Sequence, residues 1–239
     1  MDKKDRVHGS LEVLEEVYRI YKDKGLSHED LLNLIKTEYP SFAILYSFYE
    51  FIKEHDNISP FLKKIAEDKN RVEEEALKLT KDFTHILTYS RSSQVKDMLL
   101  KKKGIKRVYL TEARPHNEGI LLGLELAKKG IPVKIGPDAA LEEFIKESEV
   151  VIIGADAVFT DSFINKIGTG IIVKLAEIYK KPVFVLAIPQ KKIKKAYEKF
   201  YKIMDEPPDE ILETSHKNIE VFNRYFERVY FSKGIHLII

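Results

Sequence analysis

Cysteine is absent from this 239-residue chain. Its absence excludes disulfide bridges, thiolate metal sites and cysteine nucleophiles. Long apolar runs are also missing, since none reaches the roughly 20 residues that a helix needs to cross a bilayer. The stretch from Met1 to Ser10 is charged and polar, so it does not resemble a secretion signal. We therefore expect a soluble, cytoplasmic protein that does not associate with membranes.

Neither sign of charge predominates, because 40 lysines and arginines face 38 aspartates and glutamates. A globally basic nucleic-acid binder is not indicated, and no direct contact with nucleic acid is expected. The GxGxxG and Walker motifs of dinucleotide and nucleoside-triphosphate binding do not occur, and the seven histidines show no metal-ligand spacing. We expect neither a cofactor nor a bound metal.

Residues 1–82 are predicted to form a helical N-terminal domain. Apolar residues recur there at the three- and four-residue spacing of amphipathic helices. Caps and prolines mark the helix starts, because a serine side chain accepts from free N–H groups of the first turn and proline fits the first helical position. The expected starts are near Leu11, after the Ser27 cap with Asp30 beside it, at Pro40, and at Ser59-Pro60, with the last helix running towards Leu79.

From residue 83 the pattern changes to short apolar runs that alternate with helix-length segments. Such alternation favours βαβ units and a parallel sheet, whose buried strands are unbroken apolar runs. We therefore predict an α/β fold, in which the helical N-terminal domain is followed by a Rossmann-like domain over residues 83–239 with a mainly parallel sheet. The expected strands are His85–Thr88, Arg107–Thr111, Pro132–Ile135, Glu149–Ile153 and Pro182–Ile188, with late candidates at Ile219–Phe222, Val229–Phe231 and His236–Ile239; the helices between them start near Ser92, His116, Ala139, Thr169 and Pro189.

Polar segments follow four of the predicted strands. In open α/β sheets, ligands bind beyond the carboxyl ends of the strands, so the topology brings these segments to one edge. Serine and glycine turns at helix N-termini offer hydroxyls and free N–H groups to an anion. Together they predict an anion-binding pocket built from residues 88–93, 111–119, 136–138, and 154–156 with 165–170.

Each candidate residue also has a structural interpretation. Ser92 is expected first of all to cap the following helix. Gly168 permits a tight turn, or forms an anion cradle with Lys166 beside it. Arg114 makes a structural ion pair or forks onto a phosphate. Asp156 lies directly after a buried strand, where its carboxylate either caps a turn or takes part in a reaction.

Two lysine runs lie outside these segments. Lys101–Lys103 and Lys191–Lys195 are expected on solvated helix faces. A docking patch for acidic partners is the alternative for both runs.

Several segments, in order along the chain, resemble one known family. They are TYSRSS at residues 88–93, TEARP at 111–115, GIPV at 130–133, GADA at 154–157 and NKIGT at 165–169. These are similar to the family of translation initiation factor 2B alpha, beta and delta subunits, which also holds isomerases of methylthioribose 1-phosphate and ribose 1,5-bisphosphate. The resemblance implies a helical domain followed by a Rossmann-like domain. RVHGS at residues 6–10 resembles the family's N-terminal phosphate-contacting segment, which adds Gly9 and Ser10 to the candidates.

In the isomerase branch of this family a cysteine and an aspartate shuttle a hydrogen between neighbouring carbons. The resemblance places the aspartate at Asp156 and the cysteine at Ser90, whose hydroxyl is a far poorer acid or base than a thiol. Glu118 stands where the isomerases have glutamine, and Tyr39 where they have arginine. These departures favour the initiation-factor branch, which also has serine at the cysteine position, over an active isomerase.

The resemblance thus implies a non-catalytic, subunit-like protein that binds a phosphorylated metabolite or nucleotide and protein partners, initiation factor 2 among them. The alternative is an aldose–ketose isomerase acting on a ribose phosphate, and a third hypothesis is a purely structural interaction protein. A homodimer or larger homo-oligomer is expected. The implied ligand-binding residues are Gly9, Ser10, Arg91, Ser92, Arg114, Glu118, Asn165, Lys166 and Gly168, with Ser90 and Asp156 at the catalytic positions.

Overall fold

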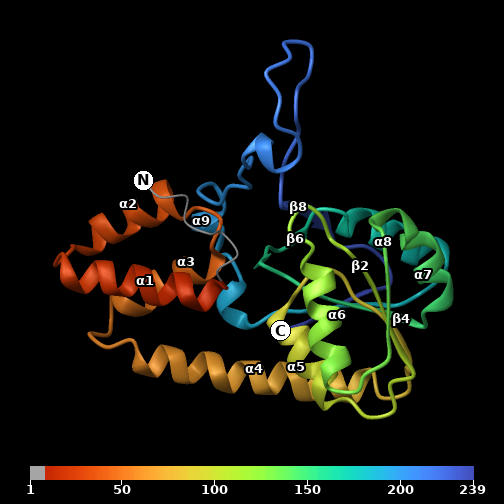
Figure 1. Ribbon diagram of the computed structural model, residues 1–239. Coiled ribbons are helices and arrows are strands. Elements are labelled where there is room, and N and C mark those ends of the chain that lie inside the picture. The colour runs from red at the N-terminus through yellow and green to blue at the C-terminus, as the bar shows by residue number, and fades with distance from the viewer. Residues whose placement is uncertain (1–8) are drawn as a thin grey trace.

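The computed structural model describes residues 9–239, and the N-terminal part of this range is helical (Figure 1). Ser27 caps the second helix as expected. Its Oγ accepts from the Asp30 amide at 3.1 Å, and the Asp30 carboxylate accepts from the Ser27 amide at 3.2 Å. The first four helices are α1 (Ser10–Asp23), α2 (His28–Glu38), α3 (Ala43–Ile52) and α4 (Ser59–Leu79).

The third helix begins later than predicted. Phe42 is its N-cap, and Pro40 lies in the turn that precedes it. The Phe42 amide donates to the Tyr39 carbonyl at 3.2 Å, and the Tyr46 hydroxyl donates to the Pro40 carbonyl at 3.3 Å. Because these bonds close a turn before the helix, the prediction that Pro40 opens it is wrong.

A parallel sheet forms the centre of the remaining chain, which confirms the predicted α/β fold. Its strand order is β3-β2-β1-β4-β7-β9, and every neighbouring pair is parallel. The order reverses between β1 and β4, and ligands of open α/β sheets bind beyond the strand ends at such a reversal. The strands are β1 (His85–Leu87), β2 (Arg107–Thr111), β3 (Val133–Gly136), β4 (Val150–Gly154), β7 (Val183–Leu186) and β9 (Ile235–Ile238).

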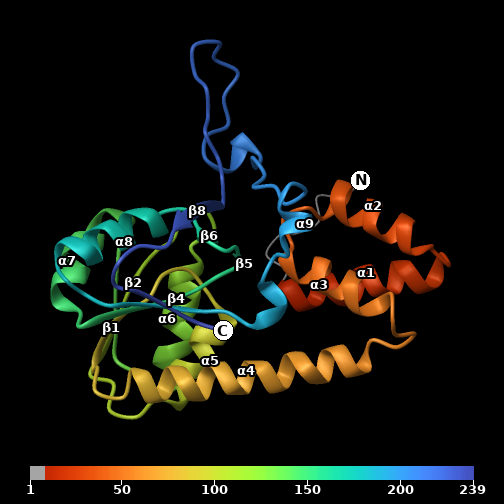
Figure 2. The same ribbon diagram turned by 180° about the vertical axis from the view of Figure 1, so that it is seen from behind.

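Helices cover both faces of this sheet (Figure 1, Figure 2). One face packs against α4, α5 and α6 through a core that includes Val72, Met98 and Leu122. The other face packs against α7 and α8, with Phe144 and Ile172 buried. The central strands β4 and β7 are therefore buried on both faces, whereas the edge strands β3 and β9 stay partly exposed. The covering helices are α5 (Ser93–Lys101), α6 (Glu118–Lys128), α7 (Leu141–Glu147) and α8 (Thr169–Ile178).

Three further strands form a small antiparallel sheet in the order β5-β6-β8. The apolar pattern predicts β8 only in part, as Val229–Phe231, and it misses β6 because polar residues occupy buried positions there. Residues 165–166, expected in a loop, are the end of β6. The strand expected at Ile219–Phe222 does not form, since this stretch is irregular and largely exposed. The bounds are β5 (Ala157–Val158), β6 (Ser162–Lys166) and β8 (Phe226–Tyr230).

The helix expected from Pro189 is reduced to two short pieces. Ile193 lies between them in the core of the N-terminal helices, and its amide donates to the Val158 carbonyl at 2.8 Å. A continuous helix would use that amide internally, so the interaction with β5 interrupts the helix. The pieces are the 3₁₀ turn η2 (Pro189–Lys191) and α9 (Lys195–Glu198), and the other 3₁₀ turns are η1 (Asp138–Ala140) and η3 (Pro208–Glu210).

Helix α4 joins two hydrophobic cores. Phe61 and Ile65, near its start, lie in the core of α1 to α3, which also takes in Ile188 from the segment after β7. Val72 and Ala76, near its end, lie in the core that covers the parallel sheet. The domain boundary at residue 82 stays a prediction, because side chains from both sides of it share these cores.

The segment of residues 205–224 projects away from both parts of the molecule (Figure 1, Figure 2). Asn223 holds the base of this segment together. Its side-chain Nδ2 donates to the Pro207 carbonyl at 2.7 Å and to the Glu210 carboxylate at 2.9 Å. The two ends of the projection are therefore held together where the chain returns to β8.

Candidate ligand-binding site

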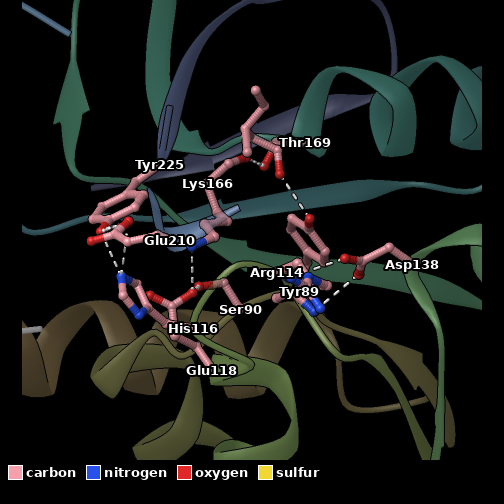
Figure 3. Close-up of polar contacts among 12 residues, drawn as sticks. Tyr89, Ser90, Arg114, His116, Glu118, Asp138, Lys166, Thr169, Glu210 and Tyr225 are labelled. Atoms are coloured by element: carbon pink, nitrogen blue, oxygen red, sulfur yellow. Dashed lines mark hydrogen bonds and ion pairs between the residues drawn. The ribbon is translucent and has the colours of Figure 1, made fainter. Parts of the chain in front are cut away.

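Ser90 follows the carboxyl end of β1 in a left-handed backbone conformation, with φ at 61°. This conformation costs a residue other than glycine about 1–2 kcal/mol, and it persists where the surrounding structure holds it. The Ser90 hydroxyl donates to the Glu118 carboxylate, at the start of α6, over 3.1 Å (Figure 3). The loop thus places this hydroxyl at the reversal of the strand order.

Lys166, the last residue of β6, points its ammonium at the same carboxylate. The Nζ atom lies 2.8 Å from Glu118 Oε2, and the side chain is only 2% exposed. Tyr225 covers it from the other side, with the ring centroid 5.1 Å from Nζ. Among residues 9–239, this nitrogen has no partner that meets hydrogen-bond geometry. Lys166 is therefore charge-paired, yet its N–H donors remain for a further acceptor.

Asp156 follows β4, and its side chain is part-buried, with 35% of its surface exposed. Its amide donates to the Ile164 carbonyl at 2.8 Å, and its Oδ1 is 3.8 Å from Lys191 Nζ. Burial raises the pKa of Asp156, and the Lys191 ammonium opposes this rise. The negative charge of the Glu118 carboxylate adds to this rise, so Glu118 acts on Asp156 across the site.

The Tyr89 hydroxyl donates to the Ile167 carbonyl at 2.7 Å. Three carboxylates lie near enough to act on it electrostatically. Burial raises the pKa of Tyr89 most, followed by Asp138, Glu118 and Glu227. The Asp138 carboxylate also accepts from the Ala113 and Arg114 amides at 2.9 and 3.0 Å, and the Arg114 side chain is exposed. These contacts bring the turns after β1, β2, β3 and β6 together at one edge, as Figure 3 shows.

The predicted anion cradle at the start of α8 holds the protein's own carboxylate. Glu227 Oε1, from β8, accepts from the Gly168 amide at 2.7 Å and from the Gly170 amide at 2.8 Å. A carboxylate is favourable there because the helix N-terminus carries partial positive charge. Gly168 has φ at 101°, and a methyl group on it would lie 2.6 Å from the Tyr89 hydroxyl. An external phosphate at this turn would have to displace Glu227.

Three other candidates are engaged with structural partners. Arg91 donates to Glu125 through Nη2 at 2.7 Å, on the outer surface of α6. Ser92 accepts from the Val95 amide at 3.4 Å and so caps α5. Asn165 donates to the Thr169 hydroxyl at 3.0 Å, on the α8 side of β6.

Gly9 and Ser10 lie at the start of α1, where the Gly9 carbonyl accepts from the Glu12 and Val13 amides. Within residues 9–239, neither forms a hydrogen bond or an ion pair with Ser90 or Lys166, and the Gly9 amide donates to Glu12. The preceding part of the predicted phosphate-contacting segment, residues 6–8, lies outside the described residues.

A polar network beside Lys166 escapes the sequence prediction. The His116 Nε2 atom lies 2.6 Å from the Tyr225 hydroxyl, which also contacts the Glu210 carboxylate. Glu210 belongs to the projecting segment, more than ninety residues along the chain from His116, and no local pattern links the two. Only the pairing of β6 with β8 brings Tyr225 over Lys166.

Two absences hold for residues 9–239. No group of three or more histidine, aspartate or glutamate side chains has an arrangement suited to a metal ion. No helix is both long enough and apolar enough to cross a membrane.

Comparison with known proteins identifies the family. Residues 43–229 match the Initiation factor 2 subunit family, which is more than three-quarters of the chain. The chain belongs to this family. The predicted resemblance is therefore confirmed, and the five segments on which it was based all lie within the matched residues.

Members of the Initiation factor 2 subunit family similar to this chain carry two kinds of name. Over 155 residues the chain is 34% identical to a ribose 1,5-bisphosphate isomerase of Methanocaldococcus jannaschii, covering 62% of this chain and 50% of the relative. Over 197 residues it is 31% identical to the ribose 1,5-bisphosphate isomerase of Thermococcus kodakarensis, covering 78% and 58%. A crystal structure of Pyrococcus horikoshii translation initiation factor eIF-2B superposes with a TM-score of 0.79 at 24% identity, covering 99% of this chain and 91% of that one.

The chain spans about half of the length of these two curated relatives. The similarity to the eIF-2B structure, at 24% identity, establishes the fold. Activity and ligand are therefore argued from the site itself.

Proposed function

We propose that this chain is a non-catalytic, initiation factor 2B subunit-like protein that binds a phosphorylated metabolite or nucleotide at the reversal between β1 and β4. The observation that carries the proposal is the state of Ser90. Its hydroxyl is bound to Glu118, and Glu118 is paired with the buried Lys166. The position implied for a catalytic thiol thus holds a hydroxyl that donates its hydrogen bond to a carboxylate. Among residues 9–239, the only base that the hydroxyl contacts is Glu118, and a carboxylate paired with an ammonium is far too weak a base to turn a serine hydroxyl into the proton shuttle that a thiol provides.

Binding of a phosphorylated compound is supported by the cations that remain. Lys166 retains unsatisfied N–H donors at the site, and the exposed Arg114 side chain extends from the same edge. Arginine recognises phosphate through paired N–H donors, and a lysine ammonium does so as a point charge. Because Glu118 and Glu227 already occupy two anion positions, the site favours a ligand with one phosphate over a bisphosphate.

Thermal unfolding tests binding directly. A nucleoside monophosphate at a hundredfold excess over its dissociation constant should stabilise the protein by about 2.7 kcal/mol. Arg114→Ala should weaken this stabilisation, whereas Arg19→Ala, an exposed arginine on α1, should leave it unchanged. If neither sugar phosphates nor nucleoside monophosphates raise the melting temperature, the binding proposal is wrong.

A second candidate function, an aldose–ketose isomerase, is favoured by Asp156. Moving a carbonyl between neighbouring carbons requires a group that takes and returns a proton, and a carboxyl with a raised pKa is suited to this. Turnover of ribose 1,5-bisphosphate and methylthioribose 1-phosphate by the purified protein distinguishes the two functions. Robust turnover that Asp156→Asn abolishes would establish the isomerase and refute the non-catalytic proposal.

Partners and location remain proposals as well. We propose a cytoplasmic homodimer or larger homo-oligomer that engages initiation factor 2. The eIF2B complexes among the structural neighbours support assembly, since one of them is a tetramer of beta and delta subunits. Analytical ultracentrifugation of the protein, alone and with initiation factor 2, tests both parts. A monomer at high micromolar concentration would contradict the first, and independent sedimentation of the two proteins the second.

A further inference from the structure

Exposed cations gather at the amino edge of the parallel sheet, on the side opposite the candidate site. The chain passes there from α4 to β1, from α5 to β2, and from α6 to β3. These three connections contribute the residues that we name the basic edge: Lys81, Lys103, Lys106, Arg107, Lys128 and Lys129, all of them exposed. Within the described range, residues 9–239, none of the six side chains forms an ion pair or a hydrogen bond.

The three connections adjoin one another in space. Lys102 Nζ donates to the Thr80 and Lys81 carbonyls at 2.7 and 3.1 Å, which fastens the end of α5 to the end of α4. The Lys106 amide donates to the Thr84 carbonyl at 2.9 Å, next to β1. The Val108 amide donates to Pro132 at 2.9 Å, next to β3. Because neighbouring strands are about 4.8 Å apart, the six cations come from adjacent connections along one edge of the sheet.

The negative ends of the helix dipoles neutralise only part of this positive charge. The C-terminus of a helix carries about half a negative charge, so three helix ends offset roughly one and a half of the six positive charges. Three carboxylates lie close by: Asp82 and Glu149 act on the Lys102 ammonium, and Glu147 interacts with Arg107 as well as with Lys134. Glu149 is already engaged, since it accepts from the Thr84 and His85 amides at 2.6 and 3.0 Å. A surplus of positive charge therefore remains on the surface.

We propose that the basic edge binds the phosphodiester backbone of a nucleic-acid duplex. Five of its six cations are lysines, which recognise phosphate as point charges rather than as a fork. The connections expose no large aromatic side chain on which an unpaired base could stack, and such stacking is typical of single-strand binders. Regularly spaced phosphates on a rigid duplex suit a surface on which cations from three neighbouring connections outnumber the carboxylates. This inference is independent of the proposed function, because it concerns the opposite edge of the sheet.

The near-neutral composition conceals this surface. The six cations come from three separate segments, and the whole chain has a net charge of only +2. Acidic residues elsewhere balance them, so the expectation that the protein avoids nucleic acid follows from the total charge and not from its distribution.

Fluorescence anisotropy with a labelled duplex of about 16 base pairs tests the proposal. Lys103→Glu, Lys106→Glu and Lys129→Glu together should weaken binding more than tenfold. The corresponding glutamine triple variant should flatten the dependence of affinity on salt by roughly one unit of logarithmic slope per lysine. The matched control replaces Lys63, Lys192 and Lys195 by glutamate, all exposed lysines outside the basic edge, and should retain most of the affinity. Circular dichroism checks that each variant is folded.

The outcomes separate the alternatives. Equal losses in the control and edge variants would assign binding to total charge and overturn the proposal. Tight binding of a poly-glutamate peptide without binding of the duplex would assign the surface to an acidic protein segment, and would overturn it too. Parallel titrations with RNA and DNA duplexes of one sequence distinguish the two sources of the backbone, and preference for either supports the proposal.

Discussion

The Lys166 ammonium lies 2.8 Å from the Glu118 carboxylate, which also accepts the Ser90 hydroxyl at 3.1 Å. One carboxylate thus neutralises the buried cation and orients the hydroxyl. Charges couple more strongly at such a site than on an exposed surface, because less water screens them. The protonation and ligand response of the site should therefore change when either partner is replaced.

Glu118→Gln should lower the free energy of unfolding, because it leaves the Lys166 ammonium buried without its counter-charge. Breaking a fully buried pair costs about 3–5 kcal/mol, and the partial exposure of Glu118 reduces the expected loss to about 2 kcal/mol. Urea unfolding measures it, with the exposed Glu177→Gln as control. Inorganic phosphate should stabilise the Glu118 variant more than the wild type. An equal phosphate response in both would show that Lys166 is closed to external anions.

Asp156→Asn should stabilise the protein at neutral pH. Since burial raises the pKa of Asp156 in the folded state, the folded protein holds this proton more tightly than the unfolded chain, whose aspartates titrate near pH 3.9. Stability therefore falls as pH rises from the unfolded pKa to the folded one, and the cost persists above that. Urea midpoints of both proteins across this range should converge as the pH is lowered. A difference that stays constant with pH would contradict the prediction.

Glu50→Gln should destabilise the protein at pH 7 by about 1 kcal/mol, a value kept small because water screens this part-exposed pair. Hydrogen bonds from Lys194, Lys53 and Tyr197 lower the pKa of Glu50 to about 2. The stabilisation is complete above the unfolded glutamate pKa, and it is lost as pH falls towards 2. Denaturant unfolding at pH 7 and at low pH should show the variant's deficit vanish in acid. The matched control is Glu54→Gln, an exposed glutamate just beyond the same helix, which should leave the unfolding free energy at pH 7 nearly unchanged.

Gly168→Ala should destabilise the protein by about 3 kcal/mol, because it combines a left-handed backbone with a steric overlap. A methyl group there would lie 2.6 Å from the Tyr89 hydroxyl. Gly130→Ala is the matched control: its φ is 81°, but a methyl group would contact nothing within 4 Å, so about 1 kcal/mol is expected. In combination with Tyr89→Phe, the Gly168 variant should lose less than the sum of the two separate changes. If the two losses in unfolding free energy simply add, the methyl group at position 168 does not overlap the Tyr89 hydroxyl.

The parallel sheet follows from the sequence because its central strands are buried on both faces. Val150 to Ile153 is an unbroken apolar run of this kind, and it forms the centre of β4. The small antiparallel sheet escapes the same reasoning. Strand β6 is buried along its whole length, yet it includes Asn165 and Lys166, which the site requires in place of apolar residues.

The sequence singles out some residues of the candidate site, but not the partners that hold them. Ser90, Glu118, Lys166 and Asp156 are singled out by their places after strands. That Glu227 fills the cradle at α8 depends on β8 pairing with β6, sixty residues apart in the chain. A sequence shows the hydrogen-bond donors at such an edge more readily than it shows which of the protein's own carboxylates already accept from them.

Helix α4 spans 21 residues, a rod of about 31 Å, with one end in each hydrophobic core. A rod anchored in this way leaves no flexible joint between the bundle and the sheet along this connection. The two halves of the molecule should consequently unfold in one cooperative step. A force applied to one half should be transmitted directly to the other through this helix.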